Sequence, residues 1–413
     1  MENTQSNIHH NLVHFLFVGQ LLLGGCNDPL EVDEGAGDTG TGDMGSDDTG
    51  TGDTGSASDA IFGYIDLGSD ETKPKSAPVY SYQNQFVVGD FDNDGRVDDI
   101  VYYSSPNRWT AYIENGPWFN LEEHYGDSMW FAGTDARFTP VVGDFDNDGY
   151  KDDIVYWGLC GNQQANCWRR HRGDGTKLLP PESMGDSMWF AHADPRSTPV
   201  VGDFDHDHFE DDILYYGLCG NYVECWRLHR GNVNNFLPPE SMGGDMWFAT
   251  DDSRSTPVVG DFNGSGYKDD IAYLGLCGAG VECWRVHLRN ANNTAFTVAG
   301  SASNSWFVFS DSRSRPFSGD FDGDGRHDDI AYYGRFGNSV IGWRIHIGNG
   351  NGSFGVNTAT LQSSLYKGFS PVAGDFGGDS SSDIAYVAEC GEWVYGWFGW
   401  WYETYPCLAT ALE

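Results

Sequence analysis

The stretch from Val87 to Tyr103 reads VVGDFDNDGRVDDIVYY and decides the fold class, because closely similar phrases follow at regular intervals along the chain. In each copy a short run ends at a glycine, an Asp-rich loop follows, and a second apolar run contains tyrosine. The glycines that open the copies are Gly89, Gly143, Gly202, Gly260, Gly319 and Gly374. Their spacing of roughly 54 to 59 residues is typical of a four-stranded propeller blade.

Each repeat contains short strand-like segments separated by Gly, Asn, Asp and Pro. In the second copy these are residues 140–145, 153–157, 168–171 and 188–190. We therefore predict an all-β propeller of six blades, each with four antiparallel strands. A seventh, degenerate blade is the alternative. The last copy has no further strand after its hairpin. A strand from the N-terminal side, around residues 79–82, is therefore expected to complete the final blade, which would remove a free sheet edge.

The Asp-rich loop predicts a calcium site. In Asp90 to Asp98 the carboxylates occupy positions one, three, five and nine, a glycine at position six permits a tight turn, and position seven offers its backbone carbonyl. Turn preference alone favours Asp, Asn and Gly, but it does not require acids at four fixed positions. Three loops are complete, and their expected ligands are Asp90, Asp92, Asp94, Arg96 and Asp98; Asp144, Asp146, Asp148, Tyr150 and Asp152; Asp320, Asp322, Asp324, Arg326 and Asp328.

The other loops are compromised. The third keeps Asp203, Asp205, Asp207 and Asp211 but has His208 at the glycine position, and the fourth has Asp261, Asn263, Ser265 and Asp269. Both are expected to bind more weakly. The sixth, with Asp375, Gly377, Asp379 and Asp383, lacks the third-position acid and is expected to hold no ion. About three to five calcium ions follow, with the first aspartate of each Asp-Asp pair favoured as the ligand and the second left open.

The phrase resembles the FG-GAP or VCBS repeat family, which includes the propeller head of integrin α subunits. The likeness extends from Val87 to Val387. The resemblance implies a propeller fold, calcium in the loops and adhesion-type roles.

The N-terminal part differs from the repeats. Residues 14–23 form an apolar run that ends in Leu23-Gly24-Gly25-Cys26, which resembles a bacterial lipobox. We therefore expect a signal peptide over 1–25, lipid on Cys26, a disordered Asp/Gly/Thr linker over 26–60 and the propeller over 61–413. This predicts a lipid-anchored protein of the bacterial cell envelope, at the outer membrane or cell surface.

The remaining cysteines support export. They form four local couples: Cys160 with Cys167, Cys219 with Cys225, Cys277 with Cys283, and Cys390 with Cys407. Three couples lie between an Ile-x-Tyr strand and a Trp-Arg strand, where a disulfide would link the arms of a hairpin. The spacing does not match zinc.

Charge excludes one class of partner. The 61 acidic and 23 basic residues give a formal net charge of -38, which repels nucleic acid and anionic membranes. Bound cations or an unfolded acidic segment relieve the self-repulsion of such a chain.

Further motifs recur. Trp-Arg-x-His occurs at residues 168–171, 226–229, 284–287 and 343–346, and Asp-x-Arg at 135–137, 194–196, 252–254 and 311–313. One active site needs one base, so repetition favours a structural role for both. Trp130, Trp189, Trp247 and Trp306 are expected to be apolar plugs between blades, with sugar stacking as the alternative.

The repeat is broken in the last hairpin, which carries the aromatic residues Trp393, Tyr395, Trp397, Trp400, Trp401, Tyr402 and Tyr405. We expect ligand binding at Trp397, Trp400, Trp401 and Tyr402, although these residues could instead seal the ring. The sequence thus favours non-catalytic binding of an extracellular protein or glycan. A polysaccharide-cleaving enzyme and a structural envelope protein are the alternatives. No nucleophile motif and no unique acid-base cluster is visible.

Overall fold

The computed structural model describes part of the chain. The described residues are 62–65, 86–104, 108–115, 118–127, 131, 135–160, 165–185, 188–243, 246–277, 280–290, 295–299, 302–303, 314–336, 340–355, 370–396 and 399–411. The signal peptide, Cys26 and the linker predicted over 26–60 lie outside them. No helix within these ranges is long and apolar enough to cross a membrane.

The described strands form antiparallel sheets, one for each copy of the repeat. The first sheet contains β2 (Phe86–Gly89), β3 (Asp99–Ser104), β4 (Arg108–Asn115) and β5 (Trp118–Asp127). The second contains β6 (Val141–Gly143), β7 (Asp153–Cys160), β8 (Ala165–His171) and β9 (Glu182–Gly185). The third contains β10 (Val200–Gly202), β11 (Asp212–Cys219), β12 (Val223–His229) and β13 (Glu240–Ser241).

The later sheets vary more. The fourth contains β14 (Val258–Gly260), β15 (Asp270–Leu276), β16 (Glu282–Arg289), β17 (Phe296–Val298) and β18 (Ala302–Ser303). The fifth contains β19 (Phe317–Gly319), β20 (Asp329–Phe336) and β21 (Val340–His346). The last contains β22 (Ser370–Gly374), β23 (Asp383–Gly396), β24 (Gly399–Ala411) and β1 (Phe62–Ile65). Short 3-10 helices are η1 (Ala136–Phe138), η2 (Pro195–Ser197), η3 (Gly220–Tyr222) and η4 (Ser253–Ser255).

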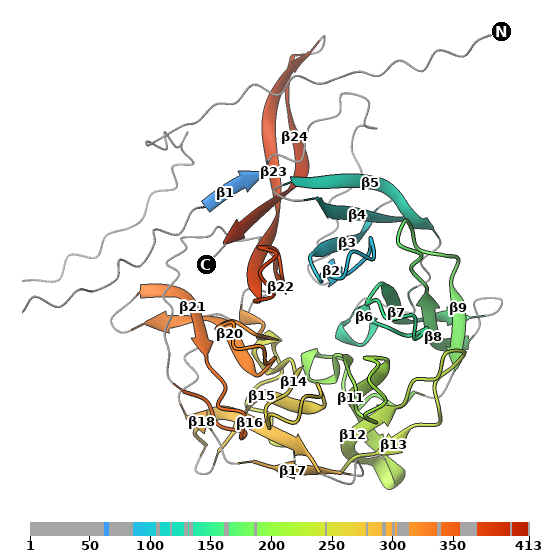
Figure 1. The fold of residues 1–413 in the computed structure, drawn as a ribbon, viewed down its shortest axis with the longest axis vertical. Helices are drawn as coiled ribbons and strands as arrows, with labels where there is room; N and C mark the ends of the chain where they lie inside the picture. The colour runs from blue at the N-terminus through green and yellow to red at the C-terminus, as the bar shows by residue number, and fades with distance from the viewer. Residues whose placement is uncertain are drawn as a thin grey trace, which may run out of the picture. The chain divides into compact units, whose positions relative to one another are not determined.

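The sheets are arranged around a common centre as an all-β propeller (Figure 1). The first strand of each sheet lies nearest the centre. These inner strands are neighbours in the order β2, β6, β10, β14, β19, β22 and again β2, so the ring of strands is closed. The predicted fold class is confirmed, and the exact number of blades stays a prediction.

One backbone hydrogen bond joins each repeat to the next. Asp90 N–H donates to the Lys151 carbonyl at 3.0 Å, and the same bond recurs from Asp144 to Glu210, Asp203 to Lys268, Asp261 to His327 and Asp375 to Val97. At the remaining junction Asp320 N–H donates to Ser382 Oγ at 3.0 Å. The glycine before each aspartate permits this approach, because a Cβ on Gly143 would lie 2.3 Å from the Glu210 carbonyl.

The last sheet is completed from the N-terminal side. β1 pairs antiparallel with β24, with Phe62 opposite Ala411 and Ile65 opposite Leu408. An N-terminal strand was expected here, but the strand is Phe62–Ile65, whereas residues 79–82 lie outside the described ranges. The pairing gives β24 a partner on each side. It therefore covers an edge whose backbone N–H and C=O groups would otherwise be open to another chain.

One strand expected in the second copy is wrong. β9 is Glu182–Gly185, and residues 188–190 do not belong to that sheet. Instead Phe190 forms an isolated bridge with Gly217 of the third sheet. This segment is the connection between two blades, so its apolar residues pack against the next blade rather than completing their own.

Candidate metal loops, axial cluster and exposed tryptophans

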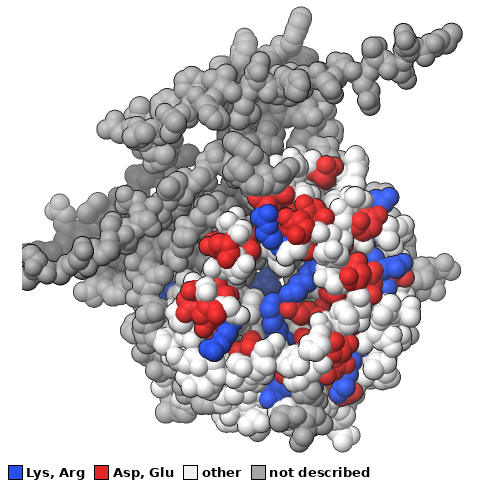
Figure 2. Space-filling model, in the orientation of Figure 1, with Lys and Arg blue, Asp and Glu red and all other residues white. Residues whose placement is uncertain are grey.

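Antiparallel strand order gives every sheet two distinct ends. The Asp-rich loop joins the first and second strands at one end, called the loop end here. The hairpin between the second and third strands, and the connection to the next blade, lie at the other end, called the disulfide end. Figure 2 shows acidic groups gathered around the ring on the side that faces the viewer, with basic groups at its centre.

The Asp-rich loops share one conformation. In the first loop Asp90 accepts hydrogen bonds from Asp94 N–H at 2.9 Å and Gly95 N–H at 3.1 Å, and Asp94 accepts one from Arg96 N–H at 2.9 Å. Equivalent bonds occur in the second and fifth loops. Even the sixth keeps them, through Asp375 and Asp379. The loop fold therefore does not depend on the full set of acids.

Four loops gather carboxylate oxygens within 4.8 Å of one another. The groups are Asp90, Asp92 and Asp94; Asp144, Asp146 and Asp148; Asp203, Asp205 and Asp207; Asp320, Asp322 and Asp329. Hard oxygen donors at this spacing could hold a metal ion of the calcium type. The third loop gathers its carboxylates although weaker binding was predicted for it. Among the described residues, the fourth and sixth loops do not bring three acidic side chains together.

Orphaned oxygens test whether an ion fits. Asp146 Oδ1, Asp205 Oδ1 and Asp211 Oδ2 are buried without a hydrogen-bond partner in the described part of the chain, and Asp98 Oδ2 has only the Arg96 guanidinium at 3.6 Å. A buried unpaired carboxylate oxygen is costly unless a cation meets it. The residues therefore fit bound cations, whose chemistry would be structural neutralisation of the loop.

The two adjacent aspartates have different roles in the first loop. Asp99 is fully buried and accepts hydrogen bonds from Phe91 N–H at 2.8 Å, Asp92 N–H at 3.0 Å and Glu114 N–H at 2.7 Å. It ties the loop to the third strand, which leaves Asp98 for the ion. In the fifth loop, however, Asp329 Oδ is the oxygen grouped with Asp320 and Asp322, so the choice between the pair differs between copies.

Burial raises the pKa values of the aspartates in the first loop. It raises the pKa of Asp90 to about 6 and that of Asp98 to about 7, and neighbouring carboxylates contribute in the same direction. Burial also raises the pKa of Asp99 to about 8. A bound cation opposes this effect because it favours the ionised form.

The third loop departs from the others. His206 and His208 have positive φ angles of 64° and 79°, the region that glycine or asparagine occupies in the first loop. The His206 ring stacks on Tyr267 of the fourth loop at 4.0 Å, and its Nε2 lies 2.6 Å from Asp269 Oδ2. The His208 ring also stacks on Tyr267, with ring centroids 5.4 Å apart. The sequence suggested only a defect at His208, whereas in the structure its ring contacts the fourth loop.

Position eight of each loop accepts the junction hydrogen bond, through its carbonyl in five copies and through Ser382 Oγ in the sixth. Its side chain differs between the copies, except that two of them have lysine. The six residues are Val97, Lys151, Glu210, Lys268, His327 and Ser382. Four of them, Lys151, Glu210, Lys268 and His327, are called the axial cluster here. Glu210 Oε1 lies 2.6 Å from Lys151 Nζ and 3.2 Å from Lys268 Nζ.

The axial cluster is electrostatically coupled. Burial acts to raise the pKa of Glu210, but the two ammonium groups overcome it and hold that pKa well below its usual range. Burial, reinforced by Lys151, lowers the pKa of Lys268 to about 8 against the attraction of Glu210. Burial and Lys268 also hold the pKa of His327 well below its usual range.

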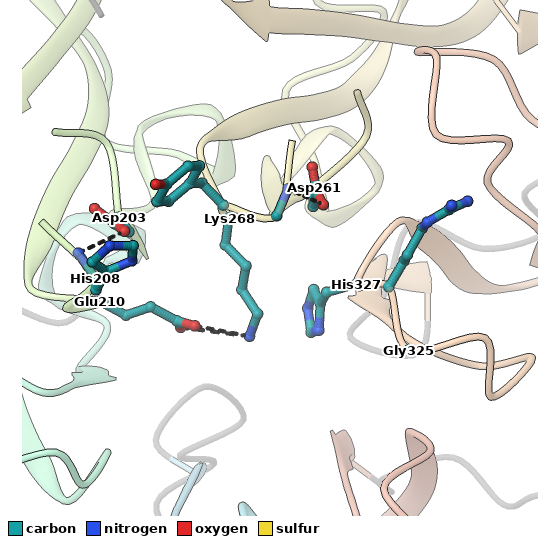
Figure 3. Close-up of a pocket in the computed structure, with 10 residues that line it drawn as sticks. Asp203, His208, Glu210, Asp261, Lys268, Gly325 and His327 are labelled. Carbon is teal, nitrogen blue, oxygen red and sulfur yellow. Dashed lines mark hydrogen bonds and ion pairs between the residues drawn. The ribbon is translucent and has the colours of Figure 1, made fainter. Parts of the chain in front are cut away.

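A pocket of about 250 Å³ opens beside the cluster (Figure 3). Glu210, Lys268 and His327 line it together with Tyr267 and Arg326. In Figure 3 the side chains of Glu210, Lys268 and His327 point toward one another from different loops. The expectation that no unique cluster of acid, base and lysine exists is therefore wrong. Its signal was position eight, where the copies differ although the aspartate that follows stays the same.

The Trp-Arg-x-His motif packs one blade on the next, as predicted. Trp168 is fully buried, and its ring lies edge-on to His229 of the following blade at 6.2 Å. The pairs Trp226 with His287 and Trp284 with His346 repeat this contact at 6.4 Å. These histidines also hydrogen-bond to tyrosine within their own blade, for example His287 Nε2 to Tyr273 Oη at 3.0 Å.

The Asp-x-Arg units brace the connections between blades, as predicted. Asp135 begins η1 by accepting a hydrogen bond from Arg137 N–H at 3.1 Å, and it pairs with the Arg137 guanidinium at 2.6 Å. Asp194 and Asp252 do the same for η2 and η4. Asp311 and Arg313 lie outside the described residues.

The tryptophans expected to be plugs are not buried. Trp189 is 59% exposed and Trp247 is 60% exposed, so the prediction is wrong for both. The neighbouring Phe190 and Phe248 fill the interior instead. The ring centroid of Phe190 lies 4.7 Å from that of Tyr215, and that of Phe248 lies 4.5 Å from that of Tyr273. Successive residues of an extended segment project to opposite sides, so one inward phenylalanine puts the tryptophan outside. Trp130 and Trp306 lie outside the described residues.

An arginine accompanies each exposed tryptophan. Leu218 N–H donates to the Trp189 carbonyl at 2.6 Å, and the Arg227 guanidinium donates to the Leu218 carbonyl at 2.7 Å. The same chain of contacts runs through Trp247, Leu276 and Arg285. The disulfide end thus presents equivalent Trp and Arg side chains in successive blades.

Disulfides close the hairpins at this end. They join Cys160 to Cys167, Cys219 to Cys225, and Cys277 to Cys283, with Cα atoms 5.8 to 5.9 Å apart. Several disulfides in one chain indicate an extracellular or envelope location. Lipidation of Cys26 stays a prediction.

The fourth couple lies in the hairpin of β23 and β24. Cys390 is opposite Tyr405 and Cys407 is opposite Ala388. Cys219 and Cys225 have the same diagonal register, opposite Val223 and Gly217. The backbone therefore suits a fourth disulfide, which stays a prediction.

The ligand-binding residues expected in this hairpin are only partly placed. Trp397 lies outside the described residues. Trp400, Trp401 and Tyr402 belong to β24, where the backbone register sets them opposite Tyr395, Val394 and Trp393. Their role in binding stays a prediction.

Comparison with known proteins assigns no family. No family model matches the chain, and no curated protein matches it. The FG-GAP or VCBS resemblance is therefore not confirmed.

The solved structures that resemble this chain have low sequence identity to it. A mutant of the Aleuria aurantia lectin in complex with alpha-methyl-L-fucoside has 12% identity and a TM-score of 0.39, covering 78% of this chain and 95% of the lectin chain. A thermostable family-43 glycoside hydrolase has 11% identity and a TM-score of 0.39, covering 68% of this chain and 95% of its own. The catalytic domain of a Coprinopsis cinerea GH62 alpha-L-arabinofuranosidase has 10% identity and a TM-score of 0.30, covering 69% and 95%. At these values no function passes to this chain.

Proposed function

We propose that this protein is a non-catalytic, calcium-stabilised propeller that binds glycans through the exposed tryptophans of its disulfide end. The observation that carries the proposal is the equal exposure of Trp189 and Trp247 at equivalent places in successive blades. A flat, exposed indole buries a large area at low entropic cost, and it suits stacking on the C–H face of a sugar ring.

Repetition adds to this function. A glycan with several equivalent sugar units can engage several blades, so weak single sites combine into a higher overall affinity. We include the hairpin of β23 and β24 in the proposed surface, with Trp397, Trp400, Trp401 and Tyr402 as its ligand-binding residues, because the paired ends of its strands lie at the same end of its sheet. With Cys26 lipidated, the linker over 26–60 would hold the propeller away from the membrane.

We further propose that the propeller has six blades. The closed order of inner strands and the junction contacts in every repeat support this number, with β1 closing the last blade. Calcium in the Asp-rich loops then stabilises the ring, while the ligand binds at the opposite end.

Binding to an array of immobilised polysaccharides and oligosaccharides tests the function. Trp189→Ala and Trp247→Ala should each weaken binding to the polymer that is recognised, and the double variant should lose at least tenfold in apparent affinity. Leu237→Ala, which changes an exposed apolar side chain near the loop end, is the matched control. Unchanged binding of the double variant would refute the assignment.

The enzyme alternative has one supporting observation. The axial cluster brings together an acid, a base and lysines from four repeats, and it occurs once in the described ring, as a catalytic centre would. Release of new reducing ends or unsaturated products from the bound polysaccharide, abolished by Glu210→Gln, would favour this alternative.

A further inference from the structure

The axial pocket differs from its acidic surroundings. Most acids at the loop end direct their oxygens into their own loops. Asp203 accepts Asp207 N–H and His208 N–H at 3.0 Å each, and Asp261 accepts Ser265 N–H at 2.6 Å and Gly266 N–H at 2.8 Å. These two carboxylates line the pocket but are already engaged.

The charges of the two lysines in the axial cluster are not fully neutralised by its one carboxylate. Lys151 and Lys268 share the single carboxylate of Glu210, so these three side chains carry one more positive charge than negative. Lys151 does not line the pocket, whereas Asp203 and Asp261 do, so the pocket favours an anion when calcium neutralises the loops of those two aspartates. Lys151 holds the shorter contact at 2.6 Å, whereas Lys268 Nζ lies 3.2 and 3.5 Å from the two Glu210 oxygens. An ammonium group has three donors, so Lys268 can bind a second anion without breaking the pair between Lys151 and Glu210.

Arg326 extends this charge to the rim. Its side chain is 51% exposed, and its nearest acid in the described structure is Asp324, 3.6 Å away. Both Arg326 and Lys268 line the same pocket, together with the ring of Tyr267. An arginine at the mouth and a lysine inside suit a carboxylate that enters from the loop end.

We propose that the axial pocket is a second binding site, which takes a small organic acid, such as a sugar acid, by its carboxylate. Lys268 binds the carboxylate, and Arg326 attracts it at the rim. The volume of about 250 Å³ lies just below the usual range for larger ligands, which limits the occupant to about one ring. This site lies at the opposite end from Trp189 and Trp247, so it is independent of the function proposed above.

Saturation-transfer NMR with galacturonate and galactose tests the site, because these sugars differ in the carboxylate. In saturating calcium the protein should bind galacturonate and not galactose, and binding should weaken as salt rises. Lys268→Met should weaken galacturonate binding at least tenfold, whereas Lys268→Arg should retain most of it. Lys177→Met, at an exposed lysine of an outer turn, is the matched control and should change nothing.

Two controls keep the test decisive. Glu210 keeps its contact with Lys151 in Lys268→Met, so this variant should fold, and Arg326→Gln offers a second test at a half-exposed residue. Galacturonate coordinated by calcium in the loops would bind equally well to wild type and Lys268→Met, which would overturn the proposal. Equal binding of galactose, or no binding of galacturonate, would also overturn it.

Discussion

At the loop end of the propeller the repeated Asp90 and Asp98 are buried, whereas at the disulfide end the repeated Trp189 and Trp247 are about 60% exposed. Both sets recur in successive blades, so recurrence alone does not separate structure from function. The two sets differ in the free energy that burial or exposure of the side chain costs the folded protein. A buried carboxylate must be bonded or neutralised, while an exposed indole without a packing partner stabilises nothing in the fold.

Calcium removal should have the largest effect and acts on the loop end alone. An ion present at about 100 times its dissociation constant stabilises the folded state by about 2.7 kcal/mol, so three complete loops contribute about 8 kcal/mol. Thermal unfolding in calcium and in EGTA, together with metal analysis, measures this. Asp148→Asn should reduce the calcium-dependent part, and Asp379→Asn in the sixth loop should not. No bound metal and an unchanged melting temperature would mean that the loops are only turns.

Two tryptophan substitutions compare buried and exposed positions directly. Trp226→Ala removes a fully buried ring that packs against His287, and it should lower the free energy of unfolding by about 3 to 5 kcal/mol. Trp247→Ala should change it by less than about 0.5 kcal/mol. Urea unfolding of both variants measures the difference. A large loss from Trp247→Ala would restore the plug interpretation and remove the basis for glycan stacking.

The pH dependence of the metal-free protein should reveal the buried acids of the loop end. Burial raises the pKa of Asp99, Asp153 and Asp270 to about 8, well above the unfolded value of 3.8. Their contribution is therefore lost as pH rises through 8, so in EGTA the melting temperature should increase when pH falls from 8.5 to 6.5. In calcium this increase should shrink.

Below pH 6.5 three buried histidines oppose this increase in stability. Burial lowers the pKa of His171, His287 and His346 to about 4, so the unfolded chain takes up protons that the folded chain refuses. Stability contributed by these neutral histidines is present above pH 6.5 and is lost as pH falls toward 4. His287→Asn removes one of these groups, so in EGTA the melting temperature of this variant should rise more steeply than that of the wild type between pH 6.5 and 4. The same slope in both proteins would contradict this assignment.

The sequence predicted what repeats and missed what varies within a repeat. The propeller fold and the packing of the Trp-Arg-x-His strands follow from spacing and composition, because every copy solves the same packing problem. The alternation of Trp189 and Phe190 shows that they project to opposite sides, but only the tertiary contact of Phe190 with Tyr215 decides which one is inside. The axial cluster escaped because its members are each about 60 residues apart and meet only when the ring closes.

The disulfides should have the smallest effect, since each closes a short loop. Cys219→Ser with Cys225→Ser should cost about 2 kcal/mol, because the chain entropy released by a loop of about seven residues is small. Loss of this bond frees the hairpin beside Trp189 without touching the Asp-rich loops, so glycan binding should fall more than calcium binding. Isothermal titration with calcium and the glycan assay on the same variant measure both. Peptide mapping of the oxidised protein should also recover Cys390 linked to Cys407, because their backbone register matches that of Cys219 and Cys225. Free thiols at both positions would show that the last hairpin differs from the others in chemistry as well as in length.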